Sequence, residues 1–177
     1  MGIYRDIALV STSSAVISYV TPQLFLNGKN WNIKVAVDVQ CRRNTKGVIT
    51  TSLETGVSSS VEVDCIHTGE QRVNLVLDIP VDSVKRWYPI GYGEQPLYKL
   101  TTVYEGAERD EKTVMMGFRT TQLVTEPIGE DEESMFFRIN DIDIFIRGVN
   151  FIPMDVFESR ITEHDIDMYP PLCLLIH

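Results

Sequence analysis

The chain has 177 residues, 44% of them hydrophobic and 23% charged, and a formal net charge of −9. This composition is typical of a soluble globular protein and not of a disordered one. The negative charge argues against nucleic acid and anionic membranes as partners, because both bind basic surfaces, and no apolar run reaches the ~20 residues that span a bilayer.

The N-terminal segment is predicted to lie outside the main domain. Residues 3–10 are compatible with a single strand, and the Ser-Thr-Ser-Ser stretch at 11–14 then predicts a linker. We therefore expect the main domain to begin at about residue 13.

Alternation of apolar and polar side chains dominates the middle of the chain. Residues 31–41 alternate almost without a break, with Trp, Ile and Val at the odd positions, which predicts a strand buried on one face. Further strands, separated by Gly-bearing or charged segments, are predicted at 48–55, 60–66, 72–79, 97–105 and 113–124. Short strands at this spacing, with no helical period between them, predict a β-sandwich or barrel.

The three cysteines form no C-x-x-C pair, so a zinc site is not predicted. Cys41 and Cys65 each continue the apolar alternation of a predicted strand and should face the core. We interpret both as buried free thiols, with a disulfide between them as the alternative. The separation of their Cβ atoms decides between the two.

The charge is distributed unevenly. Residues 1–125 hold 13 acidic and 13 basic side chains, whereas residues 126–167 hold 12 acidic and 3 basic ones. This shift predicts two structural contexts joined near Glu126 and Pro127. In the second context we expect a hairpin formed by 135–140 and 144–149, and a helix that begins after Thr162 as its N-cap.

Four segments, in order along the chain, resemble glycoside hydrolase family two, and among its members most closely the β-mannosidases. GIYRDI at 2–7 resembles the strand that closes the family's N-terminal sugar-binding β-domain, and WYPIGYGEQ at 87–95 resembles a loop of its immunoglobulin-like second domain. GFRTT at 117–121 resembles the last strand of that domain. The run from FRIN at 137 through RGVNFIPMD, ending at 155, resembles the beginning of the catalytic barrel.

The resemblance implies an all-β chain with three parts. Residues 1–12 would be the last strand of a preceding sugar-binding β-domain, and residues 13–126 an immunoglobulin-like β-sandwich. Residues 127–177 would be a partial C-terminal extension, a hairpin and a short helix, from a truncated (β/α)8 barrel.

The implied parent is a retaining β-mannosidase that removes terminal β-linked mannose from oligosaccharides. Such enzymes need two carboxyl groups about 5–5.5 Å apart, and in the resembling family these are glutamates on later barrel strands. We therefore predict no catalytic residue in this chain and no hydrolysis by it alone. No cofactor is predicted, and the acidic residues and histidine at 155–167 fit no metal-ligand spacing.

Three residues at the end of the first barrel strand are predicted to bind substrate in the intact enzyme, because barrels build their active sites there. The resemblance implies that Asp155 bonds a sugar hydroxyl and that Phe151 forms part of an apolar wall beside Asn150. The alternative is that Asn150 caps a turn and Phe151 packs in a core.

The predicted partners are the remaining domains of the parent enzyme, with the oligosaccharide bound only in the intact enzyme. The aromatic loop at 87–98 is expected to pack against neighbouring domains, with a carbohydrate platform as the alternative, and Arg119 to pair with an acid at a domain junction. If the parent is an animal enzyme, the resemblance implies a lysosomal location. Two other functions stay open: a β-glucuronidase, β-galactosidase or exo-glucosaminidase parent, and a stand-alone immunoglobulin-like adhesion or binding module.

Overall fold

The computed structural model describes residues 7, 9–66, 68–129, 132–145 and 152–167. The chain divides into two compact units, Ser11–Ile144 and a second unit of Met1–Val10 with Phe145–His177. None of the helices within these described ranges is long and apolar enough to cross a membrane.

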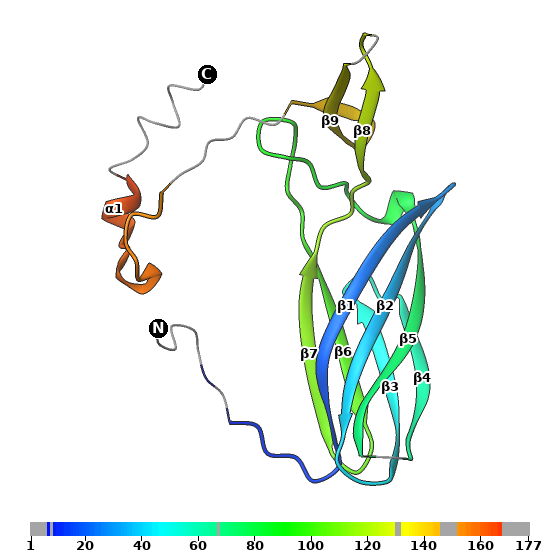
Figure 1. Cartoon of the computed structure of the whole chain (residues 1–177). Helices are drawn as coiled ribbons and strands as arrows, with labels where there is room; N and C mark the ends of the chain where they lie inside the picture. The colour runs from blue at the N-terminus through cyan, green and yellow to red at the C-terminus, as the bar shows by residue number, and fades with distance from the viewer. Residues whose placement is uncertain (1–6, 8, 67, 130–131, 146–151, 168–177) are drawn as a thin grey trace. The chain divides into compact units, whose positions relative to one another are not determined.

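The first unit contains a two-layer β-sandwich (Figure 1). One sheet has the strand order β1-β2-β5 and the other β4-β3-β6-β7, with antiparallel pairing throughout. The strands are β1 (Ala15–Asn27), β2 (Asn30–Cys41), β3 (Thr45–Leu53), β4 (Ser58–Cys65), β5 (Gly69–Pro80), β6 (Tyr98–Glu105) and β7 (Arg109–Met116). The fourth strand pairs with the third rather than with the fifth, a variation on the seven-strand immunoglobulin pattern.

The predicted alternation on β2 is confirmed. Trp31, Ile33, Val35, Val37 and Val39 are each fully buried. The inward residues of β5 lie beside them, and those of β3 and β6 face them across the core; the buried apolar ones are Val73, Leu75, Leu77, Ile79, Ile49, Leu53, Leu100 and Tyr104. Burial of these side chains is the main force that holds the two sheets together.

Strand β1 was missed by the sequence analysis, which predicted no strand between residues 15 and 30. Its register shifts between Ile17 and Tyr19, so the alternation changes phase within the strand. It also contains Pro22, which is tolerated because β1 is the edge strand of its sheet. At the N-terminus, residues 7, 9 and 10 belong to no strand, and the rest of the predicted strand at 3–10 lies outside the described residues.

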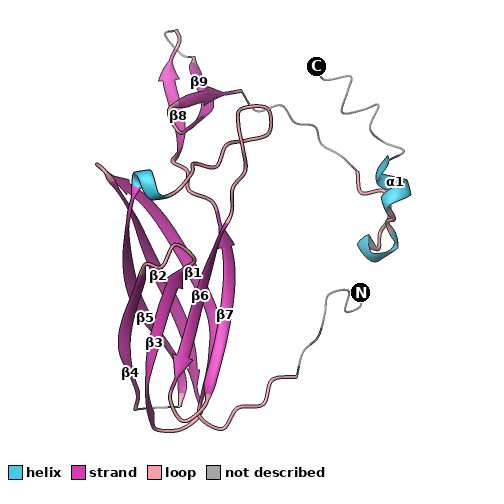
Figure 2. Cartoon of the chain, turned by 180° about the vertical axis from the view of Figure 1, so that it is seen from behind, coloured by secondary structure: helices cyan, strands magenta, loops and turns pink. Residues whose placement is uncertain are grey.

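The predicted strand at 113–124 is two strands. β7 ends at Met116 and β8 (Thr121–Pro127) starts a separate three-stranded sheet, ordered β10-β9-β8, with β9 (Glu133–Ile139) and β10 (Ile142–Ile144) (Figure 2). The expected hairpin exists, but its turn is at Asn140 and Asp141, which have φ of 50° and 68°. Two consecutive residues of positive φ give the turn whose twist matches the flanking strands.

The small sheet belongs to the same compact unit as the sandwich, which extends to Ile144 and therefore past the expected boundary near residue 126. In the second unit, the described residues form η2 (Glu158–Arg160) and α1 (Glu163–Asp167). The predicted helix start is confirmed: the Asp165 N–H donates to Thr162 Oγ1, and Thr162 donates to the Asp165 carboxylate from both its backbone N–H and its hydroxyl.

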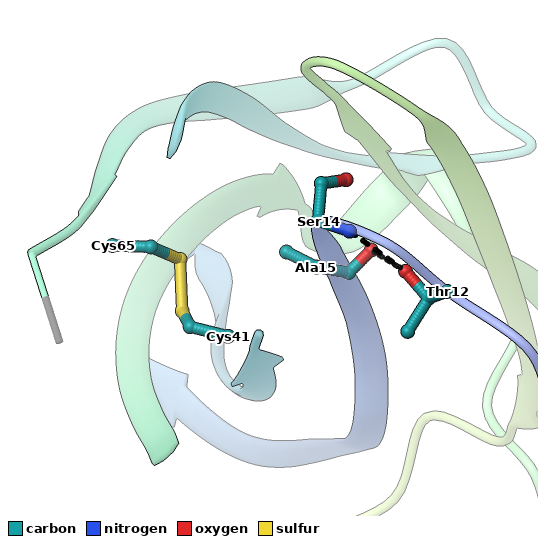
Figure 3. Close-up of a disulfide and its surroundings, with 5 residues drawn as sticks. All are labelled: Thr12, Ser14, Ala15, Cys41 and Cys65. Atoms are coloured by element: carbon teal, nitrogen blue, oxygen red, sulfur yellow. Dashed lines mark hydrogen bonds between the residues drawn. A yellow bond between two sulfur atoms is a disulfide. The ribbon is translucent and has the colours of Figure 1, made fainter. Parts of the chain in front are cut away.

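The interpretation of Cys41 and Cys65 as free thiols was wrong. The two sulfurs form a disulfide, with 5.8 Å between the Cα atoms, and both residues are 1% exposed (Figure 3). Cys41 is the last residue of β2 and Cys65 the last of β4. The strand periodicity showed that each faces the core, but only the packing of the two sheets brings the two side chains together.

The sandwich has two distinct ends. At the N-terminal pole the linker before β1 lies beside the β2–β3 and β4–β5 connections, as the pairings Ala15–Cys41, Cys41–Gly69 and Thr45–Cys65 require. The β6–β7 connection is there too, because Thr12 bonds Glu108. The C-terminal pole carries the opposite strand ends and the exit from β7 towards β8. The chain leaves by β7, whose eight residues span about 27 Å from the N-terminal pole, so it enters and leaves the sandwich roughly this far apart.

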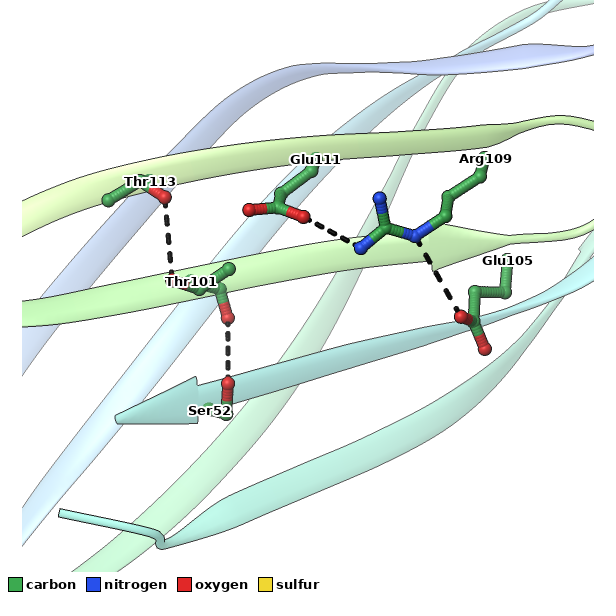
Figure 4. Close-up of polar contacts among 6 residues, drawn as sticks. All are labelled: Ser52, Thr101, Glu105, Arg109, Glu111 and Thr113. Atoms are coloured by element: carbon green, nitrogen blue, oxygen red, sulfur yellow. Dashed lines mark hydrogen bonds and ion pairs between the residues drawn. The ribbon is translucent and has the colours of Figure 1, made fainter. Parts of the chain in front are cut away.

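The outward face of the four-stranded sheet is polar (Figure 4). The hydroxyls of Thr101 and Thr113 are 3.4 Å apart, and Ser52 Oγ donates to the Thr101 carbonyl at 3.5 Å. Arg109 donates to the Glu111 carboxylate at 2.7 Å. Such contacts between neighbouring exposed side chains are typical of a solvated surface. We assign no binding or catalytic site to this face.

At the N-terminal pole Glu108 holds the linker. Its carboxylate accepts hydrogen bonds from Thr12 Oγ1 at 2.6 Å and from the Ser13 N–H at 3.1 Å. It also accepts from the Ser13 hydroxyl and from the N–H and hydroxyl of Ser14. The donors from Ser13, Thr12 and Ser14 lower the pKa of Glu108 from its ordinary 4.5 to about 2.

We predict that Glu108→Gln destabilises the chain at pH 7 and that the difference from wild type disappears as the pH falls from 4.5 to 2. The pKa of Glu108 is lower in the folded chain than in the unfolded one, so its contribution is complete above 4.5 and lost on protonation. Urea midpoints at pH 7, 4 and 2.5 test this, with the exposed Glu111→Gln as control. A difference that stays constant over this range would contradict it.

Candidate junction at the C-terminal pole

The loop between β5 and β6 is anchored to the core through Phe118. The Trp87 N–H donates to the Phe118 carbonyl at 2.8 Å. The Phe118 ring is fully buried and packs edge-on against Trp31 and Tyr98, with centroids 5.6 and 5.2 Å apart. We call residues 84–97 the Trp87 loop. The first part of this loop is therefore held to the core of the sandwich.

The Trp87 loop is internally hydrogen-bonded. The Tyr88 N–H donates to the Glu94 carbonyl at 2.9 Å, and the Gln95 side-chain amide donates to the carbonyls of Tyr88 and Gly93 at 3.0 and 2.6 Å. Gly91 has a φ of +87°, and a Cβ at Gly93 would lie 2.9 Å from the Tyr88 ring. The glycines of this motif thus permit a tight loop with a defined shape before any partner binds.

Asn140 joins the small sheet to this loop. It is 5% exposed and lies in the turn between β9 and β10. Its Oδ1 accepts from the Thr120 N–H at 3.0 Å, its own N–H donates to the Thr120 carbonyl at 3.2 Å, and its Nδ2 donates to the Trp87 carbonyl at 2.8 Å. One side chain therefore satisfies backbone groups from two other segments.

Two arginines lie at this junction. Arg119 stacks on Trp87, with its guanidinium 4.6 Å from the ring centroid, and the described residues offer it no ion pair. The expected pairing of an arginine with an acid is made instead by Arg86, whose guanidinium is 3.7 Å from Asp141. Neither Arg86 nor Asn140 belongs to a recognised catalytic pattern, so no signal in the sequence indicated either.

One face of the small sheet is apolar and partly exposed. The register places Leu123, Phe137 and Ile144 side by side, with Met135 and Ile142 on the same face. Leu123 is 53% and Met135 71% exposed, whereas Ile144 is 9% exposed, so the open part of this face lies at Leu123 and Met135. A small sheet is stabilised when another element covers its apolar face. This face is therefore suited to contact another element.

The Trp87 loop adds exposed apolar side chains at the same pole. Ile90 is 89% exposed and Leu97 50% exposed, and Tyr92 is also largely in contact with solvent. We call this loop surface and the apolar face of the small sheet together the junction surface. Exposed apolar side chains gathered at one end of a domain are typical of an interface with another domain.

The three predicted substrate-binding residues do not all lie in the described part of the chain. Asn150 and Phe151 fall within 146–151, outside the described residues. The Asp155 carboxylate accepts from the Phe157 N–H at 2.8 Å and pairs with Arg160 at 3.2 Å. Both of its oxygens thus bond groups of the same short segment, and a role in sugar binding stays a prediction.

Comparison with known proteins identifies relatives over most of the chain. Residues 16–119 match the family described as Glycosyl hydrolases family 2. A β-mannosidase of Mus musculus is 32% identical over 94% of this chain and 20% of its own length, and one of Bos taurus is 32% identical over 91% and 19%. The chain therefore spans about a fifth of the length of the curated relatives it matches.

Solved structures agree with the fold. The β-D-mannosidase of Dictyoglomus thermophilum superposes with a TM-score of 0.73 and 28% identity, covering 88% of this chain and 19% of that one. The exo-chitosanase of Amycolatopsis orientalis superposes with a TM-score of 0.73 over 93% of this chain and 19% of its own. Its identity of 19% supports the fold alone.

We predict that Asn140→Ala lowers the free energy of unfolding by about 1–3 kcal/mol, because the Trp87 carbonyl and the Thr120 N–H lose their partner in a buried place. Asn140→Gly, which keeps the positive φ, should lose a similar amount. Chemical denaturation measures both, with Asn74→Ala on the exposed face of β5 as control. A loss confined to Asn140→Ala would show that the backbone conformation matters and the hydrogen bonds do not.

Proposed function

Because the chain belongs to glycoside hydrolase family two, we propose that it is the non-catalytic β-sandwich portion of a β-mannosidase. The parent would be a retaining enzyme that removes terminal β-linked mannose from oligosaccharides. Two findings support this specificity: mammalian β-mannosidases are 32% identical over more than nine tenths of the chain, and a solved β-D-mannosidase is 28% identical.

The role we propose for the module is architectural. The junction surface carries this proposal, since an internally hydrogen-bonded loop and a partly exposed apolar sheet face lie at the pole from which the chain continues. The sandwich would space the segments on either side of it by its strand length and present the junction surface to the remaining domains of the parent. Substrate contacts by Asn150, Phe151 and Asp155 would arise only in the intact enzyme.

Absence of catalysis by the chain alone follows from the same proposal. Retention requires a carboxylic acid and a nucleophilic carboxylate about 5–5.5 Å apart across a sugar-binding site. Asp143 is paired with Arg138, and Asp155 with Arg160, which gives each of these acids a structural partner. Where the parent is an animal enzyme, we propose a lysosomal location, in keeping with the mammalian relatives.

A stand-alone binding or adhesion module is the competing function. An independent module would expose Leu123, Met135 and Ile90 to water whenever no partner is bound, which favours aggregation. A parent of sister specificity, such as a β-glucuronidase or exo-glucosaminidase, would share the fold and the architectural role. Hydrolysis assays of the parent on matched aryl glycosides separate these specificities.

We predict that the isolated chain releases no nitrophenol from an aryl β-mannoside above the rate of buffer. The reason is that the two glutamates of the resembling family would be supplied by later barrel strands. The assay needs protein purified from a host that lacks β-mannosidase. Turnover that persists through such purification would refute the proposed non-catalytic role.

We predict that Leu123→Asp leaves the unfolding midpoint of the isolated chain nearly unchanged, because this side chain is already half exposed. In the parent enzyme the same change should strongly reduce soluble yield and activity, since it places a charge against an apolar partner. The control is Val76→Asp on the outer face of β5, where an apolar side chain is 48% exposed. Equal effects of the two variants in the parent would argue against docking through the junction surface.

A further inference from the structure

The disulfide at the N-terminal pole joins the two sheets of the sandwich. Cys41 ends β2 in the three-stranded sheet, and Cys65 ends β4 in the four-stranded one. Directly after Cys65 the chain crosses from one sheet to the other and begins β5 at Gly69. The bond therefore fastens the place where the backbone passes between the layers, and it closes a loop with a sequence separation of 24.

Both sulfurs lie in the apolar core. Cys41 and Cys65 are each 1% exposed, and the buried cluster around them includes Ala15, Val39 and Val63. The Cα separation of 5.8 Å falls in the usual range for disulfides. Exchange requires an external thiolate to reach one of the two sulfurs, and burial of both residues to 1% exposure denies it that access. The arrangement is therefore that of a structural and not of a catalytic disulfide.

We infer that the sandwich matures in an oxidising compartment, where Cys41 and Cys65 are joined into a staple between its two sheets. Structural disulfides persist in such compartments, whereas cytosolic thiol systems keep cysteines reduced. In the joining step the two thiols give up two protons and two electrons to a disulfide-bearing oxidant, which becomes two thiols. The inference rests on these two residues and not on the proposed activity.

The staple acts beside the Glu108 contacts described above. Arg42, the residue after Cys41, donates its N–H to the Ser14 carbonyl at 2.7 Å, and Ser14 also bonds Glu108. Figure 3 shows the disulfide beside Ser14 and Ala15. The covalent bond and the linker contacts therefore lie at the same end of the sandwich. Reduction should loosen the N-terminal pole first and leave the C-terminal pole unchanged.

The test directs the 177-residue chain either to the cytosol or to the secretory pathway of the same host. Free thiols are alkylated during denaturation, the remaining disulfides are reduced and labelled with a second reagent, and peptides are identified by mass. We expect Cys41 and Cys65 to carry the second label only in the secretory product. Free thiols at both positions in that product, or a complete disulfide in the cytosolic one, would overturn the inference.

Stability supplies a second measurement. The double variant Cys41→Ala/Cys65→Ala should melt about 10 °C below the oxidised chain, because the unfolded ensemble regains the freedom of the closed loop. Cys173→Ala is the matched control and should leave the melting temperature unchanged. If the double variant does not fold, the reduced wild-type chain replaces it. Equal melting temperatures of oxidised and reduced chains would contradict a staple, whatever the parent hydrolyses.

Discussion

The packing of Phe118 between Trp31 and Tyr98 is the contact on which the C-terminal pole depends. Its ring closes the core where β7 ends, and its carbonyl receives the Trp87 N–H. A Cβ at Gly117 would lie 3.0 Å from the Trp87 ring, so any side chain beside Phe118 would press on this ring. The Trp87 backbone, bonded to Phe118, also accepts a hydrogen bond from Asn140, so the Trp87 loop and the small sheet are both connected to the core beside this buried aromatic group.

The two poles of the sandwich serve different physical purposes. The N-terminal pole is closed by a disulfide and by an ionised carboxylate that collects hydrogen bonds from three successive residues. The C-terminal pole is ordered by hydrogen bonds within it but leaves apolar side chains uncovered. The module is thus cross-linked at the pole where the chain enters and exposes apolar side chains at the pole where it leaves. Such a module is well suited to hold other domains at a constant separation, which agrees with the architectural role proposed for it.

The sequence by itself determined the fold class, the family and the location of most sandwich strands. Alternation on β2 predicted its buried face residue by residue, because a strand has a period of two and the core is apolar. Short motifs of glycine and aromatic residues predicted the family. These motifs are also local signals, because each such glycine is needed for the backbone conformation or close packing of its own loop. The helix cap formed by Thr162 and Asp165 was equally local and was predicted correctly.

Only the tertiary structure decided the contacts between segments distant in sequence. The Cys41–Cys65 bond depends on how two sheets approach, and no spacing along the chain encodes it. Strand β1 was not predicted because its alternation of apolar and polar residues changes phase between Ile17 and Tyr19. Its pairing with β2 continues on both sides of this change. The roles of Glu108 and Asn140 come from partners 94 and 53 residues away. Side-chain alternation specifies which face is buried, whereas the packing of sheets specifies what that face meets.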